Sequence, residues 1–211
     1  FQNEQQLLYG QPKMWSEEEI QKFRDGSDPM NYPNINYPDE MIKTWTPQNR
    51  HVISVRGGTD AVKYFASANY SKQESMFKYG EGEHYFETVG ARSNIDASIG
   101  ELLTVSLDLS FTETNNNAPA ESYSAISSAT FNAYPYQHLF YPANGLPGDG
   151  IRGEGDNPAL MVSESGYNRR KNNYYQTKMS FDFYIPVPGL SLDGHVAYDI
   201  SNRYIKEFNK P

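Results

Sequence analysis

An alternation of apolar and polar residues is the clearest pattern in this chain. From residue 103 to residue 111 every second residue is apolar and those between are polar; the apolar ones are Leu103, Val105, Leu107, Leu109 and Phe111. Successive side chains of a β-strand point to opposite faces of its sheet, so this spacing predicts a strand with one apolar and one polar face. The alternation recurs and predicts six strands, at about 51–56, 62–71, 84–99, 102–112, 173–185 and 190–205.

The connections between the predicted strands are alternately short and long. Gly57-Gly58, Gly100 and Pro188-Gly189 mark the short ones as tight turns, whereas a longer connection precedes residue 84 and a very long one covers 113–172. A transmembrane β-barrel has this arrangement, because its hairpins combine short periplasmic turns with long external loops. A soluble β-sandwich seldom sorts its loops by length in this way. The pattern therefore favours an all-β fold of antiparallel hairpins forming an arc of a large transmembrane β-barrel, with long external loops that carry short helices.

Short helices are predicted outside the strands. Ser16, followed by three glutamates and closed by Gly26, has the sequence of a capping box with a C-terminal glycine. A second helix is expected over 38–45, which begins with a proline suited to a first helical position. A third is expected over 122–133, where alanine and serine dominate.

The barrel interpretation fixes the domain organisation and the sidedness of the strands. Residues 1–47 precede a strand that ends at a short turn, so they are expected to form an external region with short helices. Residues 48–211 then hold the six barrel strands and the long external loop 113–172. The apolar side chains are expected to face lipid; the predicted lipid-facing residues are Ile53, Val55, Tyr64, Leu103, Val105, Leu107, Leu109, Phe181, Phe183, Val196 and Tyr198.

Composition narrows the possible partners. The 211 residues include no cysteine, which excludes a disulfide framework and a thiolate metal site. The net charge of −8, with both signs interspersed, argues against a nucleic-acid partner. The four histidines lie far apart in the sequence, so neither a metal site nor a cofactor is expected. The chain begins at Phe1 instead of Met, and we interpret it as a segment of a larger precursor.

Acidic residues on the polar faces of the predicted strands suggest an alternative activity. Asp108, Asp182, Asp193 and Asp199 could supply the carboxylate pair of a β-rich glycosidase. Polar-face aspartates are also what the water-filled interior of a barrel needs, so no catalytic residue and no enzyme activity are expected. A soluble carbohydrate-binding β-sandwich module is the other alternative, because it would explain both the strands and the 17 tyrosines.

Aromatic residues outside the strands are candidates for contact with a substrate or partner. Their flat faces suit a sugar ring or an apolar surface, although packing among themselves is an equally good explanation. The candidates are Trp15, Trp45, Tyr134, Tyr136, Phe140 and Tyr141.

Several segments resemble a known family. The segment Ile53-Ser54-Val55-Arg56-Gly57-Gly58-Thr59, which leads to Lys63-Tyr64-Phe65-Ala66, resembles the start of the barrel in SusC/RagA-type TonB-dependent outer-membrane transporters. Similar stretches precede and follow it in the family's order, at Asp28-Pro29-Met30-Asn31-Tyr32-Pro33-Asn34, Arg92-Ser93-Asn94-Ile95-Asp96-Ala97, Asn157-Pro158-Ala159 and Gly189-Leu190-Ser191-Leu192. Tyr37 stands where a Trp is expected in that family, and Arg56 where a small polar residue is usual.

This resemblance implies import across a membrane. Members of the family take up glycans or peptides across the outer membrane of Bacteroidetes, together with a SusD-like surface lipoprotein that closes the external mouth. TonB would act through a plug and an N-terminal part that these residues do not include. The family barrel has roughly 22 strands around a plug, so six strands would form only an arc embedded in outer-membrane lipid.

Overall fold

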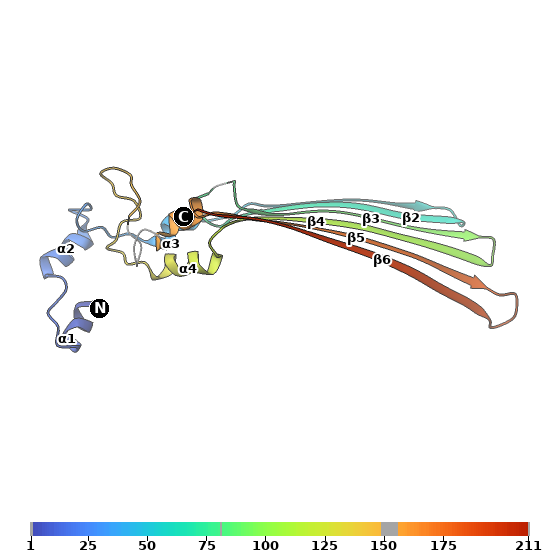
Figure 1. Ribbon diagram of the computed structural model, residues 1–211, viewed down its shortest axis with the longest axis horizontal. Coiled ribbons are helices and arrows are strands. Elements are labelled where there is room, and N and C mark those ends of the chain that lie inside the picture. The colour runs from blue at the N-terminus through green and yellow to red at the C-terminus, as the bar shows by residue number, and fades with distance from the viewer. Residues whose placement is uncertain (1, 81, 149–155, 211) are drawn as a thin grey trace.

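Six strands pair in chain order into one open antiparallel sheet (Figure 1). The computed structural model describes residues 2–80, 82–148 and 156–210, so 149–155 of the predicted long loop lie outside the described residues. The strands are β1 (Gln48–Gly58), β2 (Val62–Glu74), β3 (Tyr85–Ile99), β4 (Leu103–Pro119), β5 (Gly166–Tyr184) and β6 (Ser191–Asn209). The sheet is not closed, and β1 and β6 are its two edges. The all-β arc expected from the sequence is confirmed.

Five of the six strands are longer than the apolar alternation predicted, and β3 agrees to within one residue. β4 continues to Pro119 and β5 already begins at Gly166, so the expected loop boundaries of 113–172 are wrong, and the connection covers 120–165. The added strand residues are mostly polar and carry no apolar alternation, yet their backbones continue the ladder. Side chains also bridge the two strands there: Asn172 Nδ2 donates to Thr114 Oγ1 at 3.2 Å.

The connections are sorted between the two ends of the sheet. The short turns 59–61, 100–102 and 185–190 lie together at one end, which we call the turn end (Figure 1). The opposite end, called the helical end, carries α1 (Gln2–Leu8), α2 (Glu17–Asp25), α3 (Tyr37–Met41), α4 (Tyr123–Asn132) and α5 (Pro158–Ser163). None of the helices in the described residues has the length and apolar character needed to cross a membrane.

The expected helices form with local corrections. The capping box at α2 is complete, because Ser16 Oγ accepts from the Glu19 N–H and Glu19 Oε2 accepts from the Ser16 N–H. Gly26 ends this helix at a φ of 64°, a left-handed conformation that glycine adopts at little cost. The helix expected over 38–45 is shorter, since α3 ends at Met41. Helices α1 and α5 were not predicted.

The hydrophobic core of the described residues lies at the helical end and not on the sheet. It combines three segments that are far apart in the sequence: α3, the β2–β3 connection and the β4–β5 connection. Its buried members are Tyr37, Met41, Phe77, Ile126, Ala129, Leu139, Ala159, Met161 and Val162. Burial raises the pKa of Tyr37 to about 12, so its hydroxyl stays neutral and donates to the Gln137 carbonyl at 3.3 Å. Helices α3, α4 and α5 therefore form a packed unit with the β2–β3 connection.

A buried asparagine holds the long connection together. Asn157 Nδ2 donates to the carbonyl oxygens of Leu139, at 2.8 Å, and Gly148, at 2.9 Å. Its Oδ1 caps α5 by accepting from the N–H groups of Ala159 and Leu160. The asparagine side chain thus uses both donors and its acceptor within one buried site.

Replacement of Asn157 by alanine should loosen the helical end. The change leaves two carbonyl oxygens without their donors and removes the cap of α5, which we expect to lower the free energy of local opening by about 2–4 kcal/mol. Amide hydrogen exchange in α4 and α5 measures this opening. Asn144→Ala is the control, because Asn144 is exposed and accepts a single bond from Leu146, and it should change the opening free energy by less than about 0.5 kcal/mol. Equal effects of the two changes would contradict the assigned role.

Candidate functional site

The pairing register places side chains in straight rows across the sheet. In one row Ile53, Ala68, Ala91, Phe111, Tyr175 and Ile200 are direct partners from β1 to β6. Direct partners share a face, and every second residue along a strand returns to that face. All eleven residues predicted to contact lipid therefore lie on one face, which we call the apolar face.

An uncharged band crosses the apolar face. On β4, β5 and β6 it covers 103–111, 175–183 and 192–200, and no residue that shares this face within those ranges is charged. Nine residues span about 30 Å along a strand, or about 23 Å along the membrane normal at the tilt of about 40° that barrel strands adopt. The apolar belt of outer-membrane barrels is about 25 Å tall. The band therefore has the height needed to match the hydrocarbon layer.

The upper limit of this band is sharp. In the next row toward the helical end, Phe111 is followed by Glu113, Tyr175 by Asn173 and Ile200 by Asn202. The rings of Phe111 and Tyr175 pack together at the boundary, with centroids 5.0 Å apart. Aromatic girdles occupy this position in membrane barrels.

Nothing in the described chain covers the apolar face. Val196 is 73% exposed and Ile53 is 74% exposed, although both lie in the middle of the sheet's length. The described strands form one sheet, and the two packed sheets that define a β-sandwich are not present among them. The sandwich alternative is therefore wrong. An uncovered apolar surface of this extent marks an interaction surface.

Glycines on the apolar face are covered by aromatic rings from the neighbouring strand. A Cβ atom at Gly194 would lie 2.7 Å from Cε1 of Phe181, its direct partner on β5. Gly57 meets the ring of its partner Tyr64 in the same manner. The rings replace the missing side chains, so the apolar face stays continuous across both positions.

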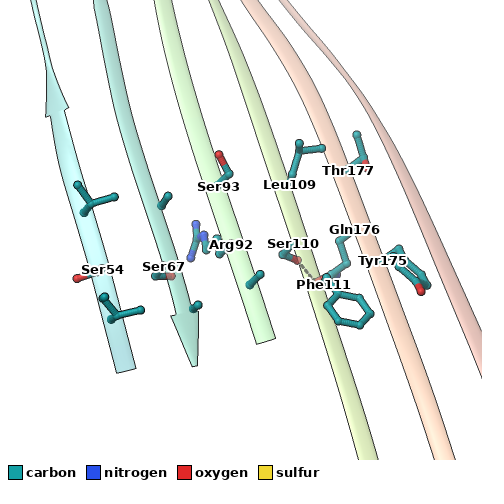
Figure 2. A pocket seen from close by; sticks show the side chains of 15 residues that line it. Ser54, Ser67, Arg92, Ser93, Leu109, Ser110, Phe111, Tyr175, Gln176 and Thr177 are labelled. Atoms are coloured by element: carbon teal, nitrogen blue, oxygen red, sulfur yellow. Dashed lines mark hydrogen bonds between the residues drawn. The ribbon is translucent and has the colours of Figure 1, made fainter. Parts of the chain in front are cut away.

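Small residues form a shallow hollow in the middle of the apolar face. Ala66, Ala68 and Ala91 lie between the larger side chains of β1 and those of β4, and the hollow has a volume of about 660 Å³. Figure 2 shows Leu109, Phe111 and Tyr175 along its border. The lining is predominantly apolar, so the hollow offers van der Waals contact without polar recognition.

The opposite face is polar and charged. Its charged residues at the level of the band are Arg56, Lys63, Arg92, Asp96, Asp108, Lys178, Asp182, Asp193 and Asp199. Hydrogen bonds connect neighbouring strands, such as Ser110 Oγ to Gln176 Oε1 at 3.1 Å, drawn dashed in Figure 2. Asp182 faces Asp193 directly, but both are exposed on an open sheet and neither is enclosed by apolar side chains as a glycosidase acid is. This face suits an aqueous interior.

The predicted aromatic contact residues fall into different surroundings. Trp15 packs against Phe23, with ring centroids 5.0 Å apart, and against Tyr136 at 5.6 Å. Tyr134 stacks on Tyr136 at 5.1 Å, so these side chains form one cluster. Phe140 lies against the core of the helical end, 5.6 Å from Tyr79, and Tyr141 pairs with His138 at 5.4 Å.

Trp45 differs from the other aromatic candidates. It is 76% exposed and lines a polar groove with Lys43, Glu74 and Lys78 at the start of β1. Its ring is therefore available to a ligand without any rearrangement of the helical end.

Comparison with known proteins identifies transporters of the same fold. No family model matches the sequence, and no curated protein matches it. A chain of the RagAB peptide transporter is 21% identical, with a TM-score of 0.58, over 83% of this chain and 20% of that chain. A chain of the RagAB peptide importer in its open-open state is 19% identical, with a TM-score of 0.66, over 99% of this chain and 26% of that chain.

The chain has the fold of a section of these transporter chains. It spans about a fifth to a quarter of their length, and the likeness at such low identity concerns the fold. The barrel arc inferred from the alternation of apolar residues and from the family resemblance thus agrees with what the solved structures show.

Sequence reasoning missed the charged rows above the apolar band. Arg169 lies over the ring of Tyr167, 4.5 Å from its centroid, and Lys72 lies 4.9 Å from the ring of Tyr85. Lys171 forms an ion pair with Glu113 at 2.8 Å. A lysine- and arginine-rich run at 169–171 was the available signal, but it lay in the expected loop.

Substitution at adjacent positions of β4 should distinguish the two faces. Leu107 lies in the middle row of the apolar band, and Ser106 lies on the polar face. In the complete barrel, Leu107→Lys should destabilise the inserted protein by about 2–4 kcal/mol, whereas Ser106→Lys should cost less than about 1 kcal/mol. Equilibrium unfolding from lipid bilayers measures both. Equal tolerance at the two positions would show that the apolar face does not contact hydrocarbon.

Proposed function

We propose that this chain is an arc of the barrel of a SusC/RagA-type TonB-dependent transporter in the bacterial outer membrane. The observation that carries the proposal is the uncharged band on one face of the sheet, nine residues tall on three adjacent strands. In water such an apolar face would associate with other apolar surfaces. In a bilayer it contacts the hydrocarbon chains of the lipids, as the outer face of a membrane barrel does. The charged opposite face then borders the water-filled interior.

The open edges of the sheet support the same proposal. β1 and β6 each have one side without a partner strand, and an exposed strand edge promotes association with other strands. Within a bilayer every backbone group needs a partner, so a spanning sheet must close on itself. Further strands of the same barrel would pair with β1 and β6.

The helical end would face the cell exterior and meet the partners of transport. The family resemblance supports a SusD-like lipoprotein above this end, and TonB would engage a part of the transporter outside these residues. The similar solved structures are of a peptide transporter and a peptide importer, which favours peptides over glycans as the cargo. The proposed role is transport without catalysis, cofactor or metal.

Cysteine labelling of intact cells tests the orientation. This chain contains no cysteine, so a single cysteine introduced into it is the one position within it that a maleimide can label. Asn144→Cys at the helical end should react with a membrane-impermeant maleimide added from outside, because this exposed residue lies in the long connection. Val187→Cys in a tight turn should react only after the outer membrane is permeabilised. The reverse pattern, or equal reactivity of both positions, would refute the proposed orientation.

Substitution of Trp45 tests its contact with cargo. Trp45→Ala removes an exposed ring beside a polar groove, and we expect uptake of labelled peptides at low concentration to fall about two- to twelvefold, as loss of one aromatic contact of about 0.5–1.5 kcal/mol predicts. Tyr9→Ala is a matched control, since Tyr9 is 82% exposed and directly follows α1, which lies at the far side of the helical end from the sheet (Figure 1). Unchanged uptake with Trp45→Ala, or an equal loss with Tyr9→Ala, would remove Trp45 from the cargo site.

A further inference from the structure

A basic groove lies on the apolar face above the uncharged band, toward the helical end. Its lining includes Tyr85, Asn117, Arg169, Lys171, Tyr204 and Lys206, all from the apolar face, and its volume is about 660 Å³. Lys171 is neutralised by Glu113. Neither Arg169 nor Lys206 forms a salt bridge with another residue in the part of the chain that the structure describes. Two cations are therefore available to a ligand.

These two cations are placed side by side. Arg169 and Lys206 are direct partners across β5 and β6, and both lie over the ring of Tyr167, at 4.5 Å and 5.9 Å from its centroid. Like charges directly opposite each other in a sheet repel, and an anion between them removes the repulsion. Arg169 Nε donates to Asn117 Oδ1 at 3.2 Å, which orients the guanidinium and leaves its terminal N–H groups for a phosphate.

The height of the groove selects the kind of anion. Lys206 lies six residues beyond Ile200, the residue at which the uncharged band ends on β6, which is about 20 Å along the strand. At the strand tilt of a barrel this corresponds to about 15 Å above the hydrocarbon. The headgroup layer of an ordinary bilayer is only about 5–8 Å thick on each side. A lipid whose anionic group reaches this level must therefore have a larger headgroup.

We infer that the groove binds the phosphorylated saccharide headgroup of an outer-leaflet glycolipid. The inference rests on the proposed function, because it requires the uncharged band to lie in a bilayer. The rings of Tyr85 and Tyr204 line the groove beside the cations and suit contact with sugar rings. Basic pockets beside membrane-spanning segments recognise anionic lipid headgroups through the same charge complementarity.

Lipid-binding measurements on the complete barrel protein in nanodiscs test this inference. The probes are lipopolysaccharide, the same lipid after dephosphorylation, phosphatidylglycerol and inorganic phosphate. The variant is Arg169→Gln with Lys206→Gln. The matched control is Lys63→Gln with Arg203→Gln, which removes the same charge from the opposite face. We expect the variant to bind lipopolysaccharide at least tenfold more weakly, and the control to change binding less than twofold.

Each outcome decides between the possibilities. Equal weakening in variant and control, or no weakening in the variant, overturns the groove as the site. If the dephosphorylated lipid or phosphatidylglycerol binds as tightly as lipopolysaccharide, the phosphorylated saccharide is not the group that the groove recognises. If inorganic phosphate competes at a concentration similar to that of lipopolysaccharide, the groove is a site for small anions and not for a glycolipid. Heat-modifiable migration on gels reports barrel insertion in the same samples. A barrel that inserts but fails the lipid test refutes this inference alone, whereas failure to insert refutes the proposed function and this inference with it.

Discussion

Backbone pairing in a fixed register is the constraint on which the rest of this structure depends. A shift of one residue in any strand pair would move that strand's apolar side chains to the charged face. Five successive strand pairs hold a register that keeps Leu107 beside Met179 and Val196, and Ser106 beside Ser180 and His195. The uncharged band, its sharp limit and the basic groove above it are all consequences of this pairing.

The sheet and the helical end are stabilised by different physics. The sheet buries almost no side chain within the described chain, so its apolar face gains nothing until another apolar medium covers it. The helical end carries its own core, in which Met41, Phe77 and Ile126 from three distant segments are fully buried. Asn157 adds a polar clamp to that core, and the positions of the chain segments at this end follow from local packing.

The sequence was informative where side-chain periodicity reflects the environment. The alternation at 103–111 identified a strand and its two faces, because one face meets an apolar and the other a polar surrounding. The same logic failed at 113–119 and 166–172, where the residues are mostly polar on both faces and only the backbone ladder continues. The core of the helical end was equally hidden, since it depends on contacts such as Tyr37 with Gln137, one hundred residues apart. The packing of Trp15, Tyr134 and Tyr136 into one cluster could not be read from their spacing for the same reason.

The antiparallel order of the sheet has a consequence for how its number of strands can change. Each hairpin leaves the helical end, turns within a few residues and comes back to where it started. Insertion or loss of a whole hairpin therefore preserves the side on which every other connection emerges, while insertion of a single strand would reverse all that follow. Duplication of a hairpin is accordingly a route by which a sheet of this kind can gain strands and still keep its long, helix-bearing connections in one compartment.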